Sequence, residues 1–324
     1  MSNREIVVDN LVKRYGDFAA VDGISLRVGA GRIFGFLGPN GAGKSTTVKI
    51  MTTLALPTAG EVWVGGYSVT SQAGQVRQIA GVALQEIGLD PLMKAPELLI
   101  MQGQLFGMDR KTARQRAEEL LEVVGLRDAV DKRVGKYSGG MRRRLDLALA
   151  LVHRPEILFL DEPTTGLDPA SRRAVWEEVR RLNRDLGMTI FLTTQYLEEA
   201  DELADEIAII DHGKLAATGT PQALKARLSA EAINLSFNDD STVARARAEL
   251  AAFSAQIKAD GRTLRLYMEN AAEAVPAVVS RLQAAGLQPN ALTLTQPTLD
   301  DVFLAVTGQR FQTETDPATE TRAA

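Results

Sequence analysis

A glycine-rich turn between an apolar run and a helix is the feature that most constrains how this chain can fold. Residues 33–37 (IFGFL) are a predicted buried strand, residues 38–46 (GPNGAGKST) form the turn, and residues 47–51 (TVKIM) predict the first turns of a helix. The backbone N–H groups at the start of such a helix have no partners within it, and the helix dipole adds positive potential there. Together these three segments predict a phosphate-binding P-loop.

Each kind of residue in the turn has a role in this prediction. The glycines permit backbone angles and close approaches that a Cβ atom would block. Lys44 supplies a positive charge for the β- and γ-phosphates, and the hydroxyl of Ser45 is a ligand for Mg²⁺. We therefore predict that a nucleotide and Mg²⁺ bind here. The predicted binding residues are Gly38, Pro39, Asn40, Gly41, Ala42, Gly43, Lys44, Ser45 and Thr46.

The overall composition limits the partners of the chain. A formal net charge of −4 gives no field that would draw it to nucleic acid or to anionic lipid. The sequence has no cysteine, which excludes disulfides and thiolate metal sites and suits a cytoplasmic protein. No stretch approaches the roughly 20 uninterrupted apolar residues of a membrane-spanning helix. We expect that the chain does not cross a membrane by itself.

Apolar runs before the P-loop predict an antiparallel β layer. They lie at residues 6–8, 11–12 and 24–28, with polar turns between them. Tyr15 lies in the first predicted hairpin. Its ring could pack against the opposite strand or stack on adenine, and the residues alone leave both interpretations open.

The segments after the P-loop predict a parallel sheet with a helical insertion. Apolar runs at 157–160, 189–192 and 207–210 alternate with helical segments, which indicates parallel strands buried on both faces. Helical periodicity from about 96 to 125 predicts a helical subdomain, at about 88–154. The predicted fold class is therefore α/β.

Paired acids follow the predicted strand at 157–160. Asp161 would hold Mg²⁺ through its water shell, and Glu162 would orient and deprotonate the attacking water. Without a P-loop, two solvated acids at a strand end would be the simpler interpretation. Because the chain has a P-loop, we interpret the acids as the second half of the nucleotide site.

A second glycine-rich segment precedes another helix. In YSGGM at 137–141, Ser138, Gly139 and Gly140 place a hydroxyl and exposed N–H groups at a helix N-terminus, which predicts a second anion site. One chain then holds two phosphate sites for one nucleotide. The arginine run that follows, at 142–144, is interpreted as a solvated helix face or a contact with a partner.

Six short motifs in this order resemble a known family. They are GPNGAGKST, Gln85, YSGGM, LFLDEP, GLDP and TTQY. Across residues 4–225 they resemble the ATP-binding subunit of ABC transporters, so the expected cofactors are ATP and Mg²⁺. Residues 296–308 (QPTLDDVFLAVTG) resemble the ending of daunorubicin/doxorubicin-resistance subunits, which export drugs through a separate membrane subunit.

The resemblance implies that two copies of the chain close head to tail on ATP. Ser138, Gly139 and Gly140 would then contact the γ-phosphate that is bound at Lys44 of the second copy. Asp168, in GLDP, would lie at the seam between the copies. A single copy would therefore hold only half of the hydrolytic site.

The resemblance also assigns roles to three further residues. Gln85 would contact the metal and the γ-phosphate and relay closure to a transmembrane permease, and Tyr15 matches the aromatic residue that stacks on adenine. Gln195 occupies the switch position, where most members have histidine. Because an amide does not titrate near neutral pH, we expect Gln195 to position groups rather than to carry protons. Glu162 would then be the general base, with Lys44 and Gln195 as the other catalytic residues.

The leading hypothesis is a transport-coupled ATPase subunit of an exporter of drugs or other hydrophobic compounds. It would lie peripherally on the cytoplasmic face of the cell membrane. Export of lipid, polysaccharide or ions is an alternative, as is a non-transport ABC ATPase acting on nucleic acid or ribosomes, for which no basic patch is present. The expected domains are a nucleotide-binding domain at 4–228, a small α/β accessory domain at 229–308 and a disordered tail at 309–324.

Overall fold

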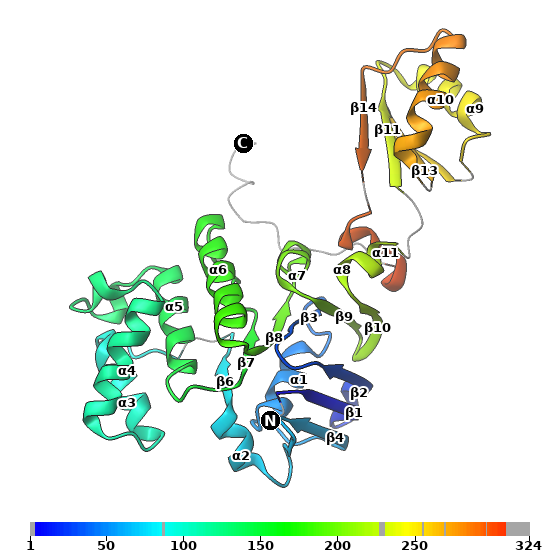
Figure 1. The fold of residues 1–324 in the computed structure, drawn as a ribbon. Helices are drawn as coiled ribbons and strands as arrows, with labels where there is room; N and C mark the ends of the chain where they lie inside the picture. The colour runs from blue at the N-terminus through cyan, green and yellow to red at the C-terminus, as the bar shows by residue number, and fades with distance from the viewer. Residues whose placement is uncertain are drawn as a thin grey trace. The chain divides into compact units, whose positions relative to one another are not determined.

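The computed structural model describes residues 4–85, 88–226, 231–254, 256–268, 270–295 and 297–308. These residues form two compact units, one ending at Pro221 and the other beginning at Gln222 (Figure 1). The tail at 309–324, which the sequence predicts to be disordered, lies outside the described residues.

The first unit begins with a four-stranded antiparallel sheet of order β2-β1-β4-β5. Its strands are β1 (Ile6–Tyr15), β2 (Phe18–Val28), β4 (Ala59–Val64) and β5 (Tyr67–Ser68). The β1–β2 hairpin pairs Tyr15 with Phe18 across a two-residue turn. The predicted antiparallel layer is therefore present.

The second sheet of this unit has six strands in the order β10-β9-β3-β8-β7-β6. They are β3 (Ile33–Leu37), β6 (Ala80–Ala83), β7 (Ile157–Asp161), β8 (Thr189–Thr194), β9 (Glu206–Asp211) and β10 (Lys214–Gly219). Five of them run parallel, as predicted. The edge strand β10 pairs antiparallel with β9, an addition to the parallel sheet that the sequence analysis did not anticipate.

Seven α-helices belong to the first unit within the described residues. They are α1 (Lys44–Met51), α2 (Ala73–Ile79), α3 (Ala95–Leu105), α4 (Arg110–Val123), α5 (Gly139–Ala150), α6 (Pro169–Leu186) and α7 (Leu197–Leu203). Figure 1 shows α3, α4 and α5 gathered beyond β6 and β7, as a helical subdomain. The short 3₁₀ turns η1 (Arg127–Ala129) and η2 (Val134–Lys136) join α4 to α5.

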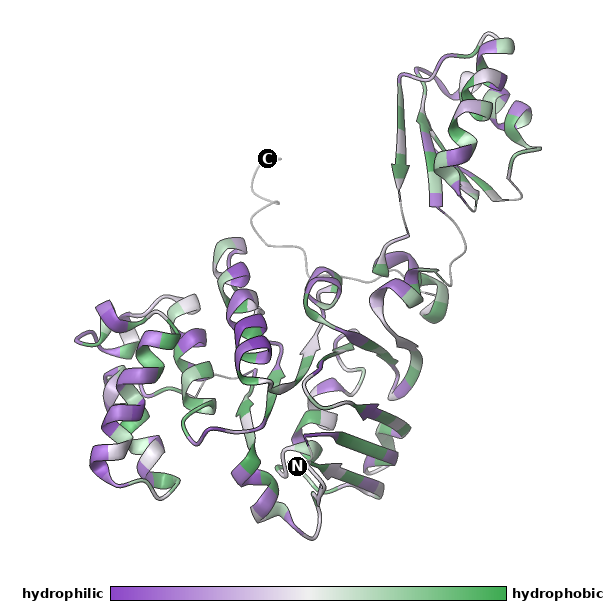
Figure 2. Ribbon diagram, in the orientation of Figure 1, coloured by the Kyte–Doolittle hydropathy of each residue, from purple (hydrophilic) through white to green (hydrophobic). Residues whose placement is uncertain are grey.

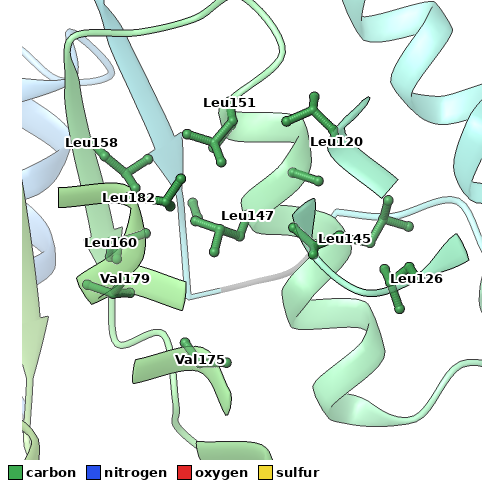
Figure 3. Close-up of a cluster of buried hydrophobic side chains, with 14 of the residues drawn as sticks. Leu120, Leu126, Leu145, Leu147, Leu151, Leu158, Leu160, Val175, Val179 and Leu182 are labelled. Atoms are coloured by element: carbon green, nitrogen blue, oxygen red, sulfur yellow. The ribbon is translucent and has the colours of Figure 1, made fainter. Parts of the chain in front are cut away.

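Two hydrophobic cores cover the faces of the core sheet. One packs the antiparallel sheet and α1 against β3, β7 and β8, with Phe36 and Phe159 around Phe191. The other joins the sheet to α6 and to the helical subdomain. Figure 3 shows Leu147 of α5, and Leu151 just after that helix, between the strand residue Leu158 and the helix residue Leu120. In Figure 2, α4 and α6 carry many hydrophilic residues along their length.

The region from 96 to 125 is helical, as predicted, and it consists of two helices. α3 ends at Leu105, and Gly107 adopts a positive φ of 85° that turns the chain. Asp109 then accepts hydrogen bonds from the N–H groups of Lys111 and Thr112 and begins α4. A glycine and an N-capping aspartate therefore divide the segment into a helical hairpin.

The second unit contains a βαββαβ arrangement. β11 (Glu231–Ser236), α9 (Asp240–Leu250), β12 (Gln256–Asp260), β13 (Thr263–Met268), α10 (Ala271–Ala284) and β14 (Ala291–Thr295) follow in order, with short helices α8 (Pro221–Ala226) and α11 (Leu299–Thr307). The antiparallel sheet has the order β12-β13-β11-β14, which is the ferredoxin-like topology. This is the small α/β unit that the sequence predicts. The prediction missed β12, which has one branched apolar residue, Ile257.

None of the helices in the described ranges combines the length and the apolar character that crossing a bilayer requires.

Candidate nucleotide site

The parallel strands bring the predicted motifs to one edge of the core sheet. β8 lies between β3 and β7, and all three run in the same direction. The turn that follows β3, the acids at the end of β7 and the Thr194–Gln195 segment at the end of β8 therefore meet there. This arrangement is the basis of the site.

The glycines of the turn allow the backbone to pack closely against neighbouring segments. A Cβ atom on Gly38 would lie 2.3 Å from the carbonyl oxygen of Ile210, and one on Gly43 would lie 2.4 Å from the carbonyl oxygen of Ala20. Gly43 also has a φ of 108°, which side chains of L-residues disfavour. Any larger residue at either position would displace the turn.

Lys44 is buried beside the acids of β7. Its Nζ donates to the carbonyl oxygens of Gly38 (2.8 Å) and Pro39 (3.1 Å), and it lies 3.1 Å from Oε1 of Glu162. The side chains of Lys44 and Glu162 are only 3% and 4% exposed. A cation held at the mouth of a glycine turn is placed to receive a phosphate group.

Asp161 and Ser45 face each other across the same edge. The Asp161 Oδ1 atom accepts hydrogen bonds from the hydroxyls of Ser45 (3.2 Å) and Thr193 (2.5 Å). Ser45 belongs to α1 and Thr193 to β8, so hydrogen bonds from two different elements hold this carboxylate. Oxygen donors of this kind suit Mg²⁺, which is commonly bound by one or two carboxylates together with substrate phosphates.

Glu162 directly follows β7 in a left-handed backbone conformation, with a φ of 50°. Its N–H donates to the carbonyl and hydroxyl oxygens of Thr193, and its Oε2 accepts from Gln85 (3.4 Å) and Thr165 (3.3 Å). A non-glycine residue at this angle stores about 1–3 kcal/mol, which surrounding contacts must offset. Residues with a strained backbone cluster at active sites and at ligand-binding segments.

A cavity of about 450 Å³ contains most of these groups. It is lined by Tyr15, Phe18, Ala20, Asn40, Gly41, Gly43, Lys44, Ser45, Thr46, Gln85 and Glu162. Phe18 is a functional candidate that the sequence analysis missed, although the two-residue turn after Tyr15 indicated its place. The two rings are exposed (53% and 63%), and Lys13 Nζ lies 5.0 Å from the centre of the Tyr15 ring.

The predicted second anion site does not line this cavity in the described residues. Ser138 is the N-cap residue of α5, and its side chain accepts from the N–H of Met141. Asp168 is the N-cap residue of α6, and its side chain accepts from the N–H groups of Ala170 and Ser171. A Cβ atom on Gly140 would lie 2.7 Å from Oγ of Ser171. The two helix N-termini are therefore adjacent to each other but separate from the P-loop cavity.

Gln195, at the switch position, is 5% exposed at the end of β8. Nearby, Glu199 of α7 is completely buried, and its Oε1 accepts from Thr164 (2.9 Å) and from Nε1 of Trp176 (2.8 Å). Burial raises the pKa of Glu199, although hydrogen bonds oppose this shift. These hydrogen bonds connect α7, which carries Glu199, to Thr164 after the paired acids and to Trp176 of α6. No sequence motif indicated Glu199.

The interpretation of the arginine run at 142–144 was wrong for one member. Arg143 is 4% exposed and donates to carbonyl oxygens next to the acids, while Arg142 is exposed. Helical periodicity explains the difference, because residues of one run point in different directions around the helix axis.

Comparison with known proteins gives the family. The ABC transporter family model matches residues 21–165, and a model of the DrrA1-3-like C-terminal domain of ATP-binding proteins matches residues 219–307. Daunorubicin resistance ATP-binding protein DrrA3 of Streptomyces coeruleorubidus is 45% identical, covering 95% of this chain and 97% of the relative. A Nod factor export ATP-binding protein I of Burkholderia orbicola is 40% identical, covering 96% and 100%.

Solved structures agree with this result. The ATP-binding cassette MJ0796, in a dimeric post-hydrolysis state bound to ADP and Pi, matches with a TM-score of 0.61 and 25% identity, over 66% of this chain and 98% of that one. Another dimeric structure of MJ0796, described as a bacterial ABC transporter cassette, matches with 26% identity and the same TM-score and coverage. The chain therefore belongs to the ABC transporter family as an ATP-binding subunit with a DrrA-like C-terminal domain, and it hydrolyses ATP.

Proposed function

We propose that two copies of this chain form a head-to-tail dimer that drives export by hydrolysing ATP at two shared sites. The observation that supports this proposal is the separation, within one chain, of the residues of the two predicted anion sites. The P-loop cavity holds Lys44 and Glu162, whereas Ser138, Gly139 and Gly140 lie elsewhere, beside Asp168. A second copy would bring its own 138–140 segment to the γ-phosphate.

Within each site the residues divide the chemistry. Tyr15, with Phe18, would stack on adenine, while residues 38–46 would bind the phosphates through backbone N–H groups and Lys44. Glu162 would accept a proton from the attacking water, since it is the carboxylate that already contacts Lys44 and Gln85. Gln195, an amide at the end of β8, would position the γ-phosphate.

The donor set is suited to Mg²⁺. Ser45 and Asp161 converge through their oxygen atoms, and Gln85 adds an amide. A hard cation shared between these groups and the phosphates fits this arrangement. The ion would neutralise the charge that develops on the transferred phosphoryl group.

A groove of about 630 Å³ supports docking of a transmembrane permease. It lies between the core sheet and the helical subdomain, with Leu84, Leu89, Phe106 and Leu149 among its lining residues. Leu84 directly precedes Gln85, which contacts Glu162. A permease segment in this groove would therefore contact Leu84, the residue next to Gln85 of the nucleotide site. The chain would then lie on the cytoplasmic face of the membrane.

The proposed cargo is a drug or another hydrophobic compound, with residues 229–308 as an accessory domain beside a nucleotide-binding domain at 4–228. The daunorubicin-resistance relatives and the DrrA-like C-terminal match support this cargo. The 40% identity to a Nod factor export ATP-binding protein supports a second candidate cargo, a compound of the Nod factor type. Purification of the complex from its native membrane, followed by vesicle transport of an anthracycline and of competing compounds, distinguishes the two.

A complementation experiment tests the shared site. Lys44→Ala removes the P-loop lysine, and Ser138→Arg blocks the second anion site. Each variant alone should lack turnover, whereas a mixture should regain it, because a mixed dimer contains one site with both halves intact. A Lys44→Ala, Ser138→Arg double variant mixed with inactive Glu162→Gln protein is the control.

The dimer itself is measured on the Glu162→Gln variant. Loss of the base should slow hydrolysis about 10²–10⁴-fold and trap an ATP-loaded dimer, seen by size exclusion with light scattering. Adding Ser138→Arg should return it to monomer. A Glu162→Gln protein that stays monomeric in saturating ATP would contradict the head-to-tail dimer.

A further inference from the structure

A buried arginine connects α5, the helix that follows the SGG segment, to the ends of strands β6 and β7. Arg143 lies on α5, and its guanidinium makes four hydrogen bonds. Nε donates to the carbonyl oxygen of Pro163 (2.8 Å), Nη2 to that of Asp161 (3.0 Å), and Nη1 to that of Leu84 (2.6 Å) and to Oδ2 of Asp146 (3.0 Å).

The positions of these carbonyl groups in the sequence give the contacts their meaning. Asp161 and Pro163 are the residues on either side of Glu162, so one guanidinium fixes the backbone before and after the proposed base. Leu84 directly precedes Gln85, whose amide contacts Glu162 (3.4 Å). The same side chain therefore fixes both segments that carry this pair of residues.

Asp146 orients the guanidinium from one turn further along α5. The two side chains are 5% and 15% exposed, and they form an i,i+3 ion pair at 3.0 Å. Burial lowers the pKa of Arg143 below its ordinary value, and it raises the pKa of Asp146 to about 6 against the effect of the arginine. The carboxylate of Asp146 lies 3.0 Å from the guanidinium and faces the buried cation.

We propose that Arg143, oriented by Asp146, is a positioning residue for ATP hydrolysis, which holds Glu162 and Gln85 in register with α5. This inference rests on the proposed role of Glu162 as the base. The planar guanidinium presents its donors in a fixed fork, and here the fork reaches three carbonyl groups on two strand ends. A lysine ammonium, as a point charge on a flexible stem, cannot hold all three together.

The alternative role for this pair is purely structural, and an apolar replacement separates the two roles. Exchanging a buried ion pair for apolar residues of similar volume commonly leaves stability unchanged or raises it. Arg143→Met with Asp146→Leu should therefore unfold near the wild-type temperature. If the carbonyl contacts position the base, the same protein should lose kcat by about 10²-fold, since small displacements at a reacting centre have effects of this size.

The experiment measures kcat, KM for ATP and unfolding temperature for the full-length chain. Arg144→Met is the matched control, because Arg144 lies on the same helix and donates to the carbonyl oxygens of Val124 and Gly125, away from the acids. The control should keep wild-type kcat. Arg143→Lys should restore part of the lost kcat, and KM should change little in all three variants, because Arg143 does not line the nucleotide cavity in the described residues.

Wild-type turnover by the apolar pair would overturn the proposal. If the apolar pair unfolds early, Arg143→Lys decides instead: wild-type kcat in that variant overturns the proposal, and reduced kcat at unchanged KM and unfolding temperature supports it. Failure of the shared-site proposal is seen separately, because there the Lys44→Ala and Ser138→Arg mixture stays inactive while wild-type protein hydrolyses ATP.

Discussion

Substitutions at Glu199 test how α7, the helix that follows Gln195, is held against α6 and the segment after the paired acids. Its carboxyl group is completely buried and accepts hydrogen bonds from the Thr164 hydroxyl and the Trp176 indole. Glu199→Ala removes the acceptor of both donors at once. A buried donor without a partner costs about 1–3 kcal/mol, so we expect a loss of about 2–6 kcal/mol in the free energy of unfolding.

Glu199→Gln is the matched variant, because its amide oxygen can still accept both hydrogen bonds. It also cannot ionise, which gives a second expectation. Since burial raises the pKa of Glu199 above its ordinary 4.5, the native state keeps its proton to a higher pH than the unfolded chain. The wild type should therefore lose stability as pH rises from 4.5 to the native pKa, while the glutamine variant should not lose it from this cause.

Tryptophan fluorescence during urea unfolding measures both effects. The two tryptophans, Trp63 and Trp176, belong to the first unit, so the signal follows the unfolding of that unit. The stability of Glu199→Gln relative to the wild type should increase between pH 5 and pH 8. If Glu199→Ala is as stable as Glu199→Gln at every pH, the carboxyl group does not hold these segments and the reasoning is refuted.

Three further results are expected at the nucleotide site and beside it. Gly43→Ala should abolish ATP binding and lower the unfolding temperature more than Gly41→Ala, whose Cβ atom meets nothing within 4 Å; equal effects in titration and thermal melts would argue against the close approach at Gly43. Tyr15→Ala and Phe18→Ala should each weaken ATP binding by about 1–3 kcal/mol in calorimetry, as for other bases stacked on aromatic rings. Asp168→Ala should destabilise the protein in urea unfolding near neutral pH but not in strong acid, because hydrogen bonds lower the pKa of this helix cap and its contribution disappears as the pH falls through that lowered value.

The core of the fold could be predicted because its residues act locally. A turn such as 38–46 can be recognised from the positions of its glycines. The acidic pair can be recognised from the apolar run that directly precedes it. The parallel order of these strands then brings the motifs together. For this reason the sequence predicts the P-loop, the acids of β7 and the α/β class without knowledge of distant contacts.

The parts that were missed depend on contacts between segments far apart in the chain. Arg143 looks like the exposed Arg142 in the sequence, and only its rotation about the axis of α5 turns it toward Leu84, Asp161 and Pro163. Glu199 is one of two adjacent glutamates, and burial by α6 distinguishes it. Periodicity alone gives no absolute rotation for a helix whose partners are unknown.

The second unit shows the same limit for strands. β12 pairs with β13 as an edge strand, where Lys258 and Asp260 are exposed. An edge strand needs few apolar residues, so its sequence resembles a loop. Its existence follows from the completed βαββαβ topology rather than from its own composition.

The neighbouring starts of α5 and α6 have an electrostatic consequence for the proposed dimer. Two helices that begin side by side place two partial positive charges, each about half an elementary charge, close together, and the exposed carboxylate of Asp168 lies beside them. In the proposed dimer, the exposed N–H groups at these helix starts would bind the γ-phosphate of a triphosphate held by the second copy, so the nucleotide would hold the two surfaces together. Cleavage to a diphosphate would remove the γ-phosphate from that contact, and the strength of the assembly would follow the charge of the nucleotide.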